Sequence, residues 1–305
     1  LFRLPAAGPH LTFKGGTSLS KGWKLIQRFS EDLDVVIDRR FLGFTGEAAP
    51  ETAPSQKQRA RRLDALRVAC QLYVRDVLLP ELALALGESP LERDRWRVTM
   101  DPDDVDAQTV LFTYPAEAAS SDYIRPAVKI ELGGRSDTEP CAEPSINPYV
   151  AEALPAVCGD CAFTVRTVAP ERTFWEKVAL LHEEAHRTGD VLPKARLARH
   201  YYDVWALIQA GVAERAMADA SLFARVAAHR AVFFRKSREA QASLQPGTLA
   251  VVPSGSRRVS WRRDYEAMRE SMFFGEPPSF DDILDVVGEF ERRFNARVGP
   301  TSPRT

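Results

Sequence analysis

Two acidic residues that follow a glycine-rich turn near the start of the chain have the spacing of a metal and phosphate site. The acids, Asp32 and Asp34, alternate with apolar residues, so strand geometry places both carboxylates on one face. Mg²⁺ binds through one or two carboxylates together with substrate phosphates. The turn can hold such a phosphate through backbone N–H groups and the start of the following helix; it consists of Gly15, Gly16, Thr17 and Ser18. These features predict a site for Mg²⁺-dependent nucleotidyl transfer.

A solvated strand surface is the alternative interpretation of Asp32 and Asp34. Like charges on one strand face repel each other unless a cation lies between them. The Gly-Gly turn also precedes the acids by about one helix, as a strand–turn–helix–strand unit requires. Both arguments favour the metal site.

Further residues are candidates for the same chemistry. Glu131 lies on a separate predicted strand and is the natural third carboxylate, although Lys129 on the same face offers it a simple ion pair. Arg28 precedes the acids and is a candidate to bind a triphosphate, with a surface arginine as the alternative. Asp203 has a simple local interpretation, an i,i+4 pair with Arg199, and its surroundings alone do not select it.

Lys177 is a candidate because of where the sequence predicts a helix to begin. Thr173 and Glu176 have the spacing of a capping box, with a hydroxyl cap and Glu three residues later. Lys177 then falls near the first turn, where the helix dipole favours anions. A lysine placed against this preference indicates an anionic ligand such as phosphate. A solvated lysine is the alternative.

The elements that must position these residues fall into two parts of the chain. In residues 1–165, apolar residues alternate in several short runs, which predicts strands, and recur at spacings of three and four in a long run, which predicts a helix. Residues 137–162, rich in Pro and acidic residues, are expected to be irregular. The predicted strands are 11–14, 33–37, 96–98, 110–114 and 128–132, and the predicted helices are 17–27 and 55–79, the second ended by Pro80.

Residues 166–305 show helical spacing almost throughout. Pro193 leads into a helix that Gly211 can close, and a last helix is predicted over 281–295. The expected fold is α+β. A domain of residues 1–165 contains a mixed sheet, and a mainly α-helical C-terminal domain of residues 166–305 completes the active site.

The charge balance excludes a strong general attraction to nucleic acid or membrane. The 305 residues carry 41 basic and 42 acidic side chains, for a net charge of −1, so any RNA contact must come from a local basic patch. Two candidates are Lys57–Arg62, on a helix face, and the stretch from Arg230 to Lys236, which includes Phe233 and Phe234. Solvation or core packing is the alternative for both.

Four cysteines are too few for a disulfide framework in a chain of this length. Cys158 and Cys161 have CxxC spacing and Cys141 precedes them, but a zinc site needs four ligands and only His182 and His186 are near candidates. Reduced thiols are the favoured interpretation. No apolar run is long enough to span a bilayer and no secretory leader is visible, so the expected location is the cytoplasm, without membrane contact.

Several of these motifs together resemble one known family. FKGGTSLS followed by RFSEDLD, then ERTFWEK, RHYYD, Asp264–Tyr265 and the closing PSFDDIL, are similar to the AbiEii/AbiGii-type toxins, within the polymerase-β-like nucleotidyltransferase superfamily. The resemblance covers nearly the whole chain, which begins at Leu1 rather than Met, and a leading helix of the family is expected to be cut away. Gly-Gly-Thr stands where the superfamily usually has Gly-Ser, and Glu131 replaces the commoner Asp.

The resemblance implies a minimal polymerase-β-like nucleotidyltransferase fold and Mg²⁺-dependent transfer of a nucleotide from an NTP, with release of diphosphate. It also implies a toxin of abortive-infection toxin–antitoxin systems, with a separately encoded antitoxin. The acceptor is expected to be RNA, such as a tRNA 3′ end. A protein-modifying nucleotidyltransferase and a non-catalytic module that binds an NTP or the antitoxin remain as alternatives. The family's motif residues fall here on Gly15, Gly16, Thr17, Asp32, Asp34, Lys177 and Asp203. With this resemblance, Glu131 or Asp203 is expected to orient or deprotonate the acceptor hydroxyl.

Overall fold

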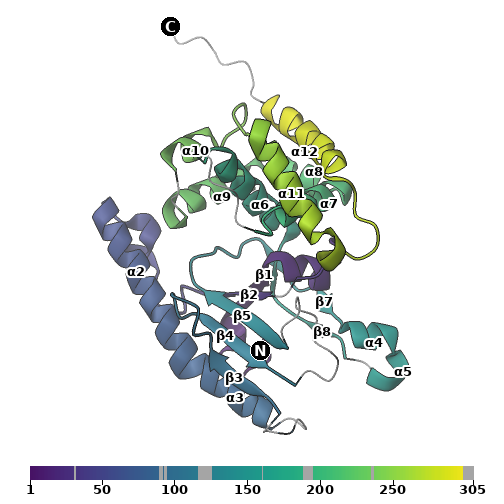
Figure 1. The fold of residues 1–305 in the computed structure, drawn as a ribbon. Coiled ribbons are helices and arrows are strands. Elements are labelled where there is room, and N and C mark those ends of the chain that lie inside the picture. Colours follow the sequence, from purple (N-terminus) through teal and green to yellow (C-terminus); the bar gives the residue numbers. More distant parts are fainter. Residues whose placement is uncertain are drawn as a thin grey trace. The chain divides into compact units, whose positions relative to one another are not determined.

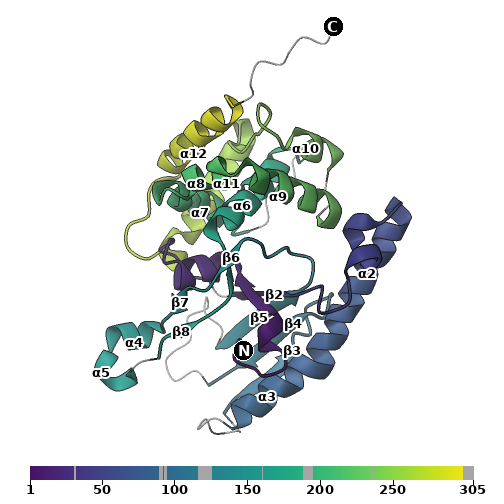
Figure 2. The ribbon, with the colours of Figure 1, turned by 180° about the vertical axis from the view of Figure 1, so that it is seen from behind.

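The computed structural model describes residues 1–30, 32–88, 92, 95–115, 126–159, 161–187, 195–234 and 237–297. The chain forms two compact units, drawn in Figure 1 and from behind in Figure 2. The first unit comprises Leu1–Trp23 and Ser30–Ala169, and the second comprises Lys24–Phe29 and Pro170–Thr305. The predictions that concern Pro193, Arg235 and Lys236 lie outside the described residues.

Among the described residues of the first unit, seven strands form one mixed sheet. They are β1 (Leu11–Lys14), β2 (Asp32–Ile37), β3 (Arg97–Met100), β4 (Thr109–Thr113), β5 (Ala127–Gly133), β6 (Cys141–Ala142) and β9 (Thr167–Val168). Their order is β3-β4-β5-β2-β1-β9-β6. β2 is parallel to β5 and antiparallel to β1, and β3, β4 and β5 are antiparallel neighbours. The predicted mixed sheet is confirmed, and the acid-bearing strand lies in its middle.

The two faces of this sheet differ because strand side chains alternate. On β2, Val35 and Ile37 are buried, whereas Asp32 and Asp34 are half-buried on the opposite face. A long helical segment packs along the sheet (Figure 1), with α2 (Gln56–Tyr73) against β5 and α3 (Leu79–Gly87) against β3. This segment covers the apolar face and leaves the acids on the other.

The helix predicted to end at Leu79 is longer than the sequence indicated. α2 continues through the π-helical turn η5 (Val74–Leu78) directly into α3, in whose first turn Pro80 lies. A proline inside a helix normally clashes with the carbonyl four residues earlier. Here Pro80 lies in the first turn of α3, directly after the π-helical turn, a position where proline is tolerated. The predicted end of the helix near Leu79 is therefore wrong, because helical structure runs on to Gly87.

The helix after the Gly-Gly turn is shorter than predicted. α1 (Gly15–Thr17) passes into the π-helical η2 (Ser18–Gly22), so helical structure ends at Gly22 rather than at Gln27. Residues Lys24–Phe29 belong to the second unit, where Arg28 forms a β-bridge with Phe273. The other short helices before α2 are η1 (Gly8–His10), η3 (Gly46–Ala48) and η4 (Pro50–Thr52).

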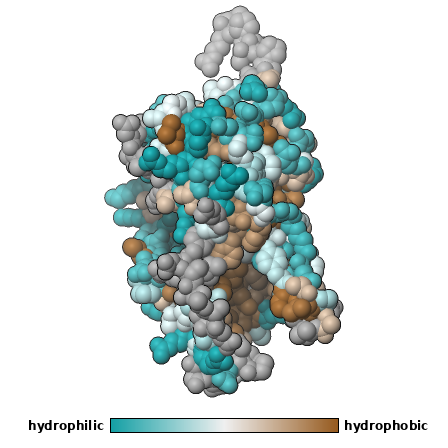
Figure 3. Space-filling view, turned by 45° about the vertical axis from the view of Figure 1, so that its right-hand side comes forward, coloured by the Kyte–Doolittle hydropathy of each residue, from teal (hydrophilic) through white to brown (hydrophobic). Residues whose placement is uncertain are grey.

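The described residues between 145 and 164 form an arm, whereas the sequence predicted irregular structure over 137–162. β7 (Ser145–Ile146) pairs with β8 (Phe163–Thr164), and α4 (Tyr149–Ala153) and α5 (Pro155–Cys158) lie between them. In both ribbon views the arm extends away from the sheet. Figure 3 shows apolar side chains at its surface; the exposed ones are Tyr149, Val150 and Leu154.

Helices make up the second unit, as predicted for the C-terminal half. They are α6 (Pro170–Ala185), α7 (Arg199–Gln209), α8 (Val212–Ala218), α9 (Ala220–Phe233), α10 (Arg238–Ser243), α11 (Gly255–Met272) and α12 (Phe280–Asn295). α6 contacts α7, α8 and α9, and its Trp175 packs edge-on against Phe174 and Phe223 in an aromatic core. No helix in the described residues is long and apolar enough to cross a membrane.

The helix that carries Lys177 begins earlier than predicted. α6 starts at Pro170, a residue favoured at the first helical position. Thr173 and Glu176 therefore lie inside the helix, and the predicted capping box is wrong. Lys177 lies about two turns from the start, where the helix dipole has little effect. The helix dipole therefore gives no reason to expect an anionic ligand at Lys177.

Candidate active site

Four charged side chains lie together on the face of the sheet opposite α2 and α3. The register of β2 and β5 places Asp34 beside Glu131 and Asp32 beside Lys129. Paired residues on neighbouring strands point to the same face, so the structure brings Glu131 next to the predicted acid pair. We call Asp32, Asp34, Lys129 and Glu131 the acid face.

The backbone of the Gly-Gly turn lies against this face. Gly15 has a φ of +78°, and a Cβ built on it would lie 2.0 Å from Asp34 Oδ2, so only glycine fits here. Thr17 Oγ1 donates a hydrogen bond to the carbonyl of Asp32 (2.5 Å), and Ser18 Oγ donates to that of Gly15 (2.9 Å). The two hydroxyls fix the turn, one to its own backbone and the other to the acid-bearing strand.

Lys129 forms the ion pair that the sequence left open as the alternative for Glu131. Its Nζ lies 2.9 Å from Glu131 Oε1. The hydrogen bond to Glu131, with a smaller contribution from the charge of Asp32, raises the pKa of Lys129. Glu131 is therefore beside Asp34 and held by a cation at the same time.

The donor set of the acid face fits Mg²⁺, because carboxylate oxygens are the ligands of hard cations. In the described part of the chain, no three His, Cys, Asp or Glu side chains form a metal site by themselves. The same finding covers Cys141 and Cys161, and it gives no support to a zinc site there.

A second cluster of charged side chains is buried in the second unit. Asp203 on α7 is fully buried, and its Oδ2 lies 2.7 Å from Lys177 Nζ on α6. Arg28 binds the same carboxylate with two hydrogen bonds, Nε to Oδ1 at 2.6 Å and Nη2 to Oδ2 at 2.8 Å. Asp203 thus takes two distant partners in place of Arg199, its local alternative. We call Arg28, Lys177, His200 and Asp203 the Asp203 cluster.

The electrostatics of this cluster assign Asp203 and Arg28 to positioning. Burial raises the pKa of Asp203, but the charges of Arg28 and Lys177 outweigh burial and hold that pKa well below its usual range. Such a carboxylate is a poor base. Arg28 is itself buried and bound to Asp203 and to the carbonyl of Phe29, so in this geometry it holds Asp203 rather than a triphosphate.

His200 completes the cluster, although the sequence analysis did not select it. Its Nδ1 lies 3.4 Å from Lys177 Nζ. Burial, and then the charge of Lys177, hold the pKa of His200 well below its ordinary value, so the ring is neutral and Nδ1 can accept from the ammonium group. The i,i+3 spacing of His200 and Asp203 on one helix face was the signal that could have found it.

With this geometry in place, the comparisons with known proteins decide the family. A model of the family described as "Nucleotidyl transferase AbiEii toxin, Type IV TA system" matches residues 1–286. The chain belongs to this AbiEii family. Among solved structures, MenT4, a nucleotidyltransferase toxin from Mycobacterium tuberculosis H37Rv, is similar, with 15% identity, a TM-score of 0.48, and coverage of 95% of this chain and 77% of that chain. No curated protein matches.

Membership of the AbiEii family makes the chain a nucleotidyltransferase toxin of a type IV toxin–antitoxin system. Its substrate is an NTP, and an antitoxin is its partner in the system. The non-catalytic binding module is thereby set aside. The likeness to MenT4 is too distant to add an argument about function, which rests on the family match.

One further pattern in this AbiEii chain has the spacing of a zinc site. His182-Glu183-Glu184-Ala185-His186 matches the HExxH pattern of zinc proteases. His182 Nδ1 accepts a hydrogen bond from the Ala250 N–H (3.0 Å), and its Nε2 therefore carries the proton that it donates to the carbonyl of Ala240 (2.9 Å). Glu183 pairs with Arg230 through two hydrogen bonds, at 2.8 and 2.7 Å. These residues hold helices together.

The basic stretches considered for RNA binding have different outcomes. Arg230 is buried on Glu183, and Phe233 is buried as well, so these two side chains pack in the core, whereas Phe234 is half-buried. Lys57 and Arg61 are exposed on α2. That helix face stays a predicted RNA contact.

Proposed function

We propose that this AbiEii protein transfers a nucleotide from an NTP to an RNA acceptor, such as a tRNA 3′ end, in a Mg²⁺-dependent reaction. The observation that carries the proposal is the acid face. The carboxylates of Asp32 and Asp34 lie on one strand face beside Glu131. Gly15 lies so close to the Asp34 carboxylate that a residue with a Cβ does not fit at this position. Paired carboxylates beside a phosphate-binding turn suit a nucleotide bound with Mg²⁺.

Each part of the acid face has a role in this reaction. Asp32 and Asp34 would hold Mg²⁺, which when bound stabilises charge on the attacking and leaving oxygens. Gly15 and Gly16 offer backbone N–H groups at the start of α1 to the β- and γ-phosphates. Thr17, through its bond to the Asp32 carbonyl, keeps this turn in register with the acids.

The transfer forms one bond and breaks one. The acceptor hydroxyl oxygen bonds to the α-phosphorus, the bond from that phosphorus to the oxygen bridging to the β-phosphate breaks, and diphosphate leaves. The hydroxyl proton passes to the Glu131 carboxylate and then to water. Glu131 is preferred to Asp203 as the base, because two cations keep the pKa of Asp203 low.

In the second unit, we assign Lys177 to a phosphate group of the NTP. An ammonium group has three hydrogens. Two point to Asp203 Oδ2 and His200 Nδ1, and the third can be donated to a phosphate oxygen, where a fixed cation stabilises charge on the leaving diphosphate. Burial lowers the pKa of Lys177, and the charge of Asp203 opposes this shift. Asp203, itself bound by Arg28, keeps the lysine in place.

The test uses the pure protein, each NTP labelled at the α-phosphate, Mg²⁺, and either total bacterial RNA or total bacterial protein. We expect label in RNA from at least one NTP, and its loss when a chelator removes the metal. Label in protein alone would contradict the RNA acceptor and support the protein-modifying alternative. Label that persists in the chelator would contradict the role given to Mg²⁺.

A further inference from the structure

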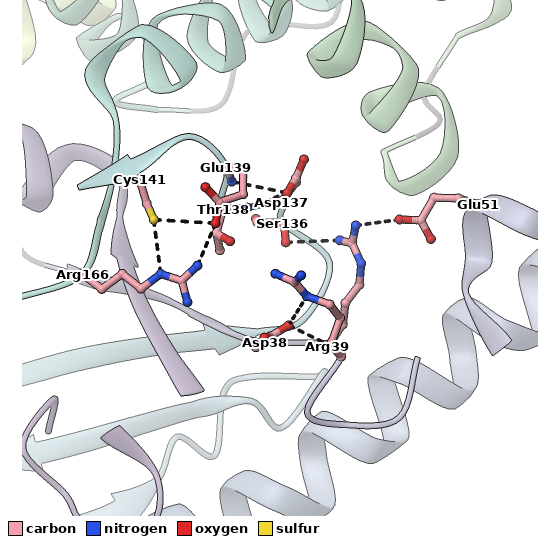
Figure 4. A network of polar contacts seen from close by, with 10 residues as sticks. Asp38, Arg39, Glu51, Ser136, Asp137, Thr138, Glu139, Cys141 and Arg166 are labelled. Carbon is pink, nitrogen blue, oxygen red and sulfur yellow. Dashed lines mark hydrogen bonds and ion pairs between the residues drawn. The ribbon is translucent and has the colours of Figure 1, made fainter. Parts of the chain in front are cut away.

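A pocket of about 370 Å³ lies in the first unit, between the segments that follow the parallel strands β2 and β5. One wall includes Arg39, Phe44 and Ala49, and the other includes Ser136. Figure 4 shows the polar side chains around it. Arg39 connects the two walls, because it binds Glu51 Oε1 (2.6 Å) on its own side and the carbonyl of Ser136 (3.4 Å) across the pocket.

The pocket lies next to the acid face along β2, and its lining does not include the four acid-face residues. Val36, which lines it, lies two residues after Asp34 on β2, and so on the same side of the sheet. Lys14 pairs with Asp34 across β1 and β2, and its Nζ donates to Ser136 Oγ in the pocket wall (2.8 Å). The pocket therefore begins where the acid pair ends.

The phosphate-binding turn lies toward the opposite end of β2. Gly15 follows the last residue of β1, and Thr17 binds the carbonyl of Asp32, the first residue of β2. In nucleotidyl transfer the attacking and leaving oxygens stand roughly in line on opposite sides of the phosphorus. With the leaving diphosphate at the turn, the attacking hydroxyl comes from the side of Val36, where the pocket lies.

The chemistry of the lining suits a nucleoside better than a run of phosphates. Carboxylates hydrogen-bond ribose hydroxyls, and aromatic rings and guanidinium planes stack on the unpaired bases at RNA ends. Phe44 and Arg39 offer such surfaces. The acids outnumber the arginines, which disfavours several phosphates; the charged lining residues are Asp38, Arg39, Arg40, Glu51, Asp137 and Glu139. The volume suits a single small ligand.

We propose that this pocket receives the 3′-terminal ribonucleoside of the RNA acceptor, with its hydroxyls directed at the acid face. The inference rests on the proposed function and adds the place where the acceptor binds. The terminal 3′-hydroxyl oxygen then bonds to the α-phosphorus of the NTP, diphosphate leaves, and the hydroxyl proton passes to Glu131. A protein side chain would bring neither a ribose for the carboxylates nor a base for Phe44.

The experiment fills the pocket and measures binding and transfer separately. Ala49→Trp places a large side chain in the lining, and Ala48→Trp is the matched control, because Ala48 is exposed one residue earlier and outside the pocket. Binding is measured by fluorescence anisotropy with a short single-stranded RNA that ends in a 3′-deoxynucleotide and so cannot react. Transfer is measured with the 3′-hydroxyl RNA and α-labelled NTP, and thermal unfolding shows that both variants fold.

We expect Ala49→Trp to weaken RNA binding at least about tenfold, or ~1.4 kcal/mol, with an unchanged KM for the NTP, while Ala48→Trp behaves as wild type. Phe44→Ala should weaken RNA binding roughly fivefold or more, as expected when one base loses its stacking partner. This variant tests the pocket if Ala49→Trp does not fold. RNA binding unchanged by pocket variants would overturn the inference, and so would a raised KM for the NTP alone. Absence of transfer by wild type, with RNA binding still sensitive to the pocket, would instead count against the proposed function.

Discussion

Replacing Gly15 by Ala should separate the placement of Asp34 from the stability of the fold. The added Cβ would lie 2.0 Å from Asp34 Oδ2 and 2.7 Å from its Cγ, whereas ordinary contacts begin near 3.4 Å. The carboxylate then has to move by more than ~1 Å, and a misplacement of about 1 Å at a reacting centre costs roughly a hundredfold in rate. We expect kcat for nucleotide transfer to fall by about that factor.

The control for this variant is Gly43→Ala. Gly43 also has a positive φ, +87°, but a Cβ built on it meets nothing within 4 Å. Both variants should lose about 1–2 kcal/mol of stability, because an L side chain is strained in this backbone region. The rate of label transfer at saturating NTP measures the change in kcat, and thermal unfolding measures the change in stability. If Gly15→Ala retains activity within about threefold of Gly43→Ala, which is less than 1 kcal/mol of barrier, the reasoning about Asp34 is refuted.

Asp203→Asn should lower the free energy of unfolding by about 3–5 kcal/mol, because two buried cations lose their carboxylate. Arg199→Ala should change this free energy little. If denaturant unfolding shows the same loss of stability for both variants, the buried pairing of Asp203 is contradicted. His200 has a lowered pKa, so the unfolded chain binds one more proton than the folded chain, and the free energy of unfolding falls as the pH drops below the ordinary value of 6.5. His200→Gln should weaken this dependence of stability on pH and should raise the KM for the NTP. Unfolding curves on both sides of pH 6.5 and transfer kinetics measure these two effects. Transfer to RNA should fall steeply with salt and with Arg61→Glu, while NTP binding changes much less; RNA labelling indifferent to both would count against RNA as the acceptor.

The acid face could be predicted from the sequence because its signals are local. Alternation along β2 decides which face carries Asp32 and Asp34, and the Gly-Gly turn lies within one helix of them. Glu131 was also found, since its strand alternates in the same way. What local spacing could not decide was whether Glu131 binds Lys129, because that depends on side-chain geometry and on the register of β2 and β5.

The Asp203 cluster was found only in part, because its contacts join distant segments. Arg28 and Asp203 are 175 residues apart, and no spacing rule connects them. Lys177 was selected for the wrong reason, since α6 begins at Pro170 and the lysine is far from the helix start. Its binding by Asp203 and His200 depends on the packing of α6 against α7, which the sequence pattern does not determine.

The most direct test of the central claim is the rate of nucleotide transfer to RNA by Asp34→Asn, measured with Mg²⁺ beside Asp76→Asn. The control makes the same change at an exposed residue that pairs only with its neighbour Arg75 among the described ion pairs. We predict that Asp34→Asn falls below about a hundredth of the wild-type rate, since a bound metal supplies several kcal/mol, with an equal or higher melting temperature because carboxylate repulsion is relieved. Asp76→Asn should keep the wild-type rate. A folded Asp34→Asn protein that retains more than about a tenth of wild-type activity, or ~1.4 kcal/mol at most, would contradict the claim that this acid pair holds the metal.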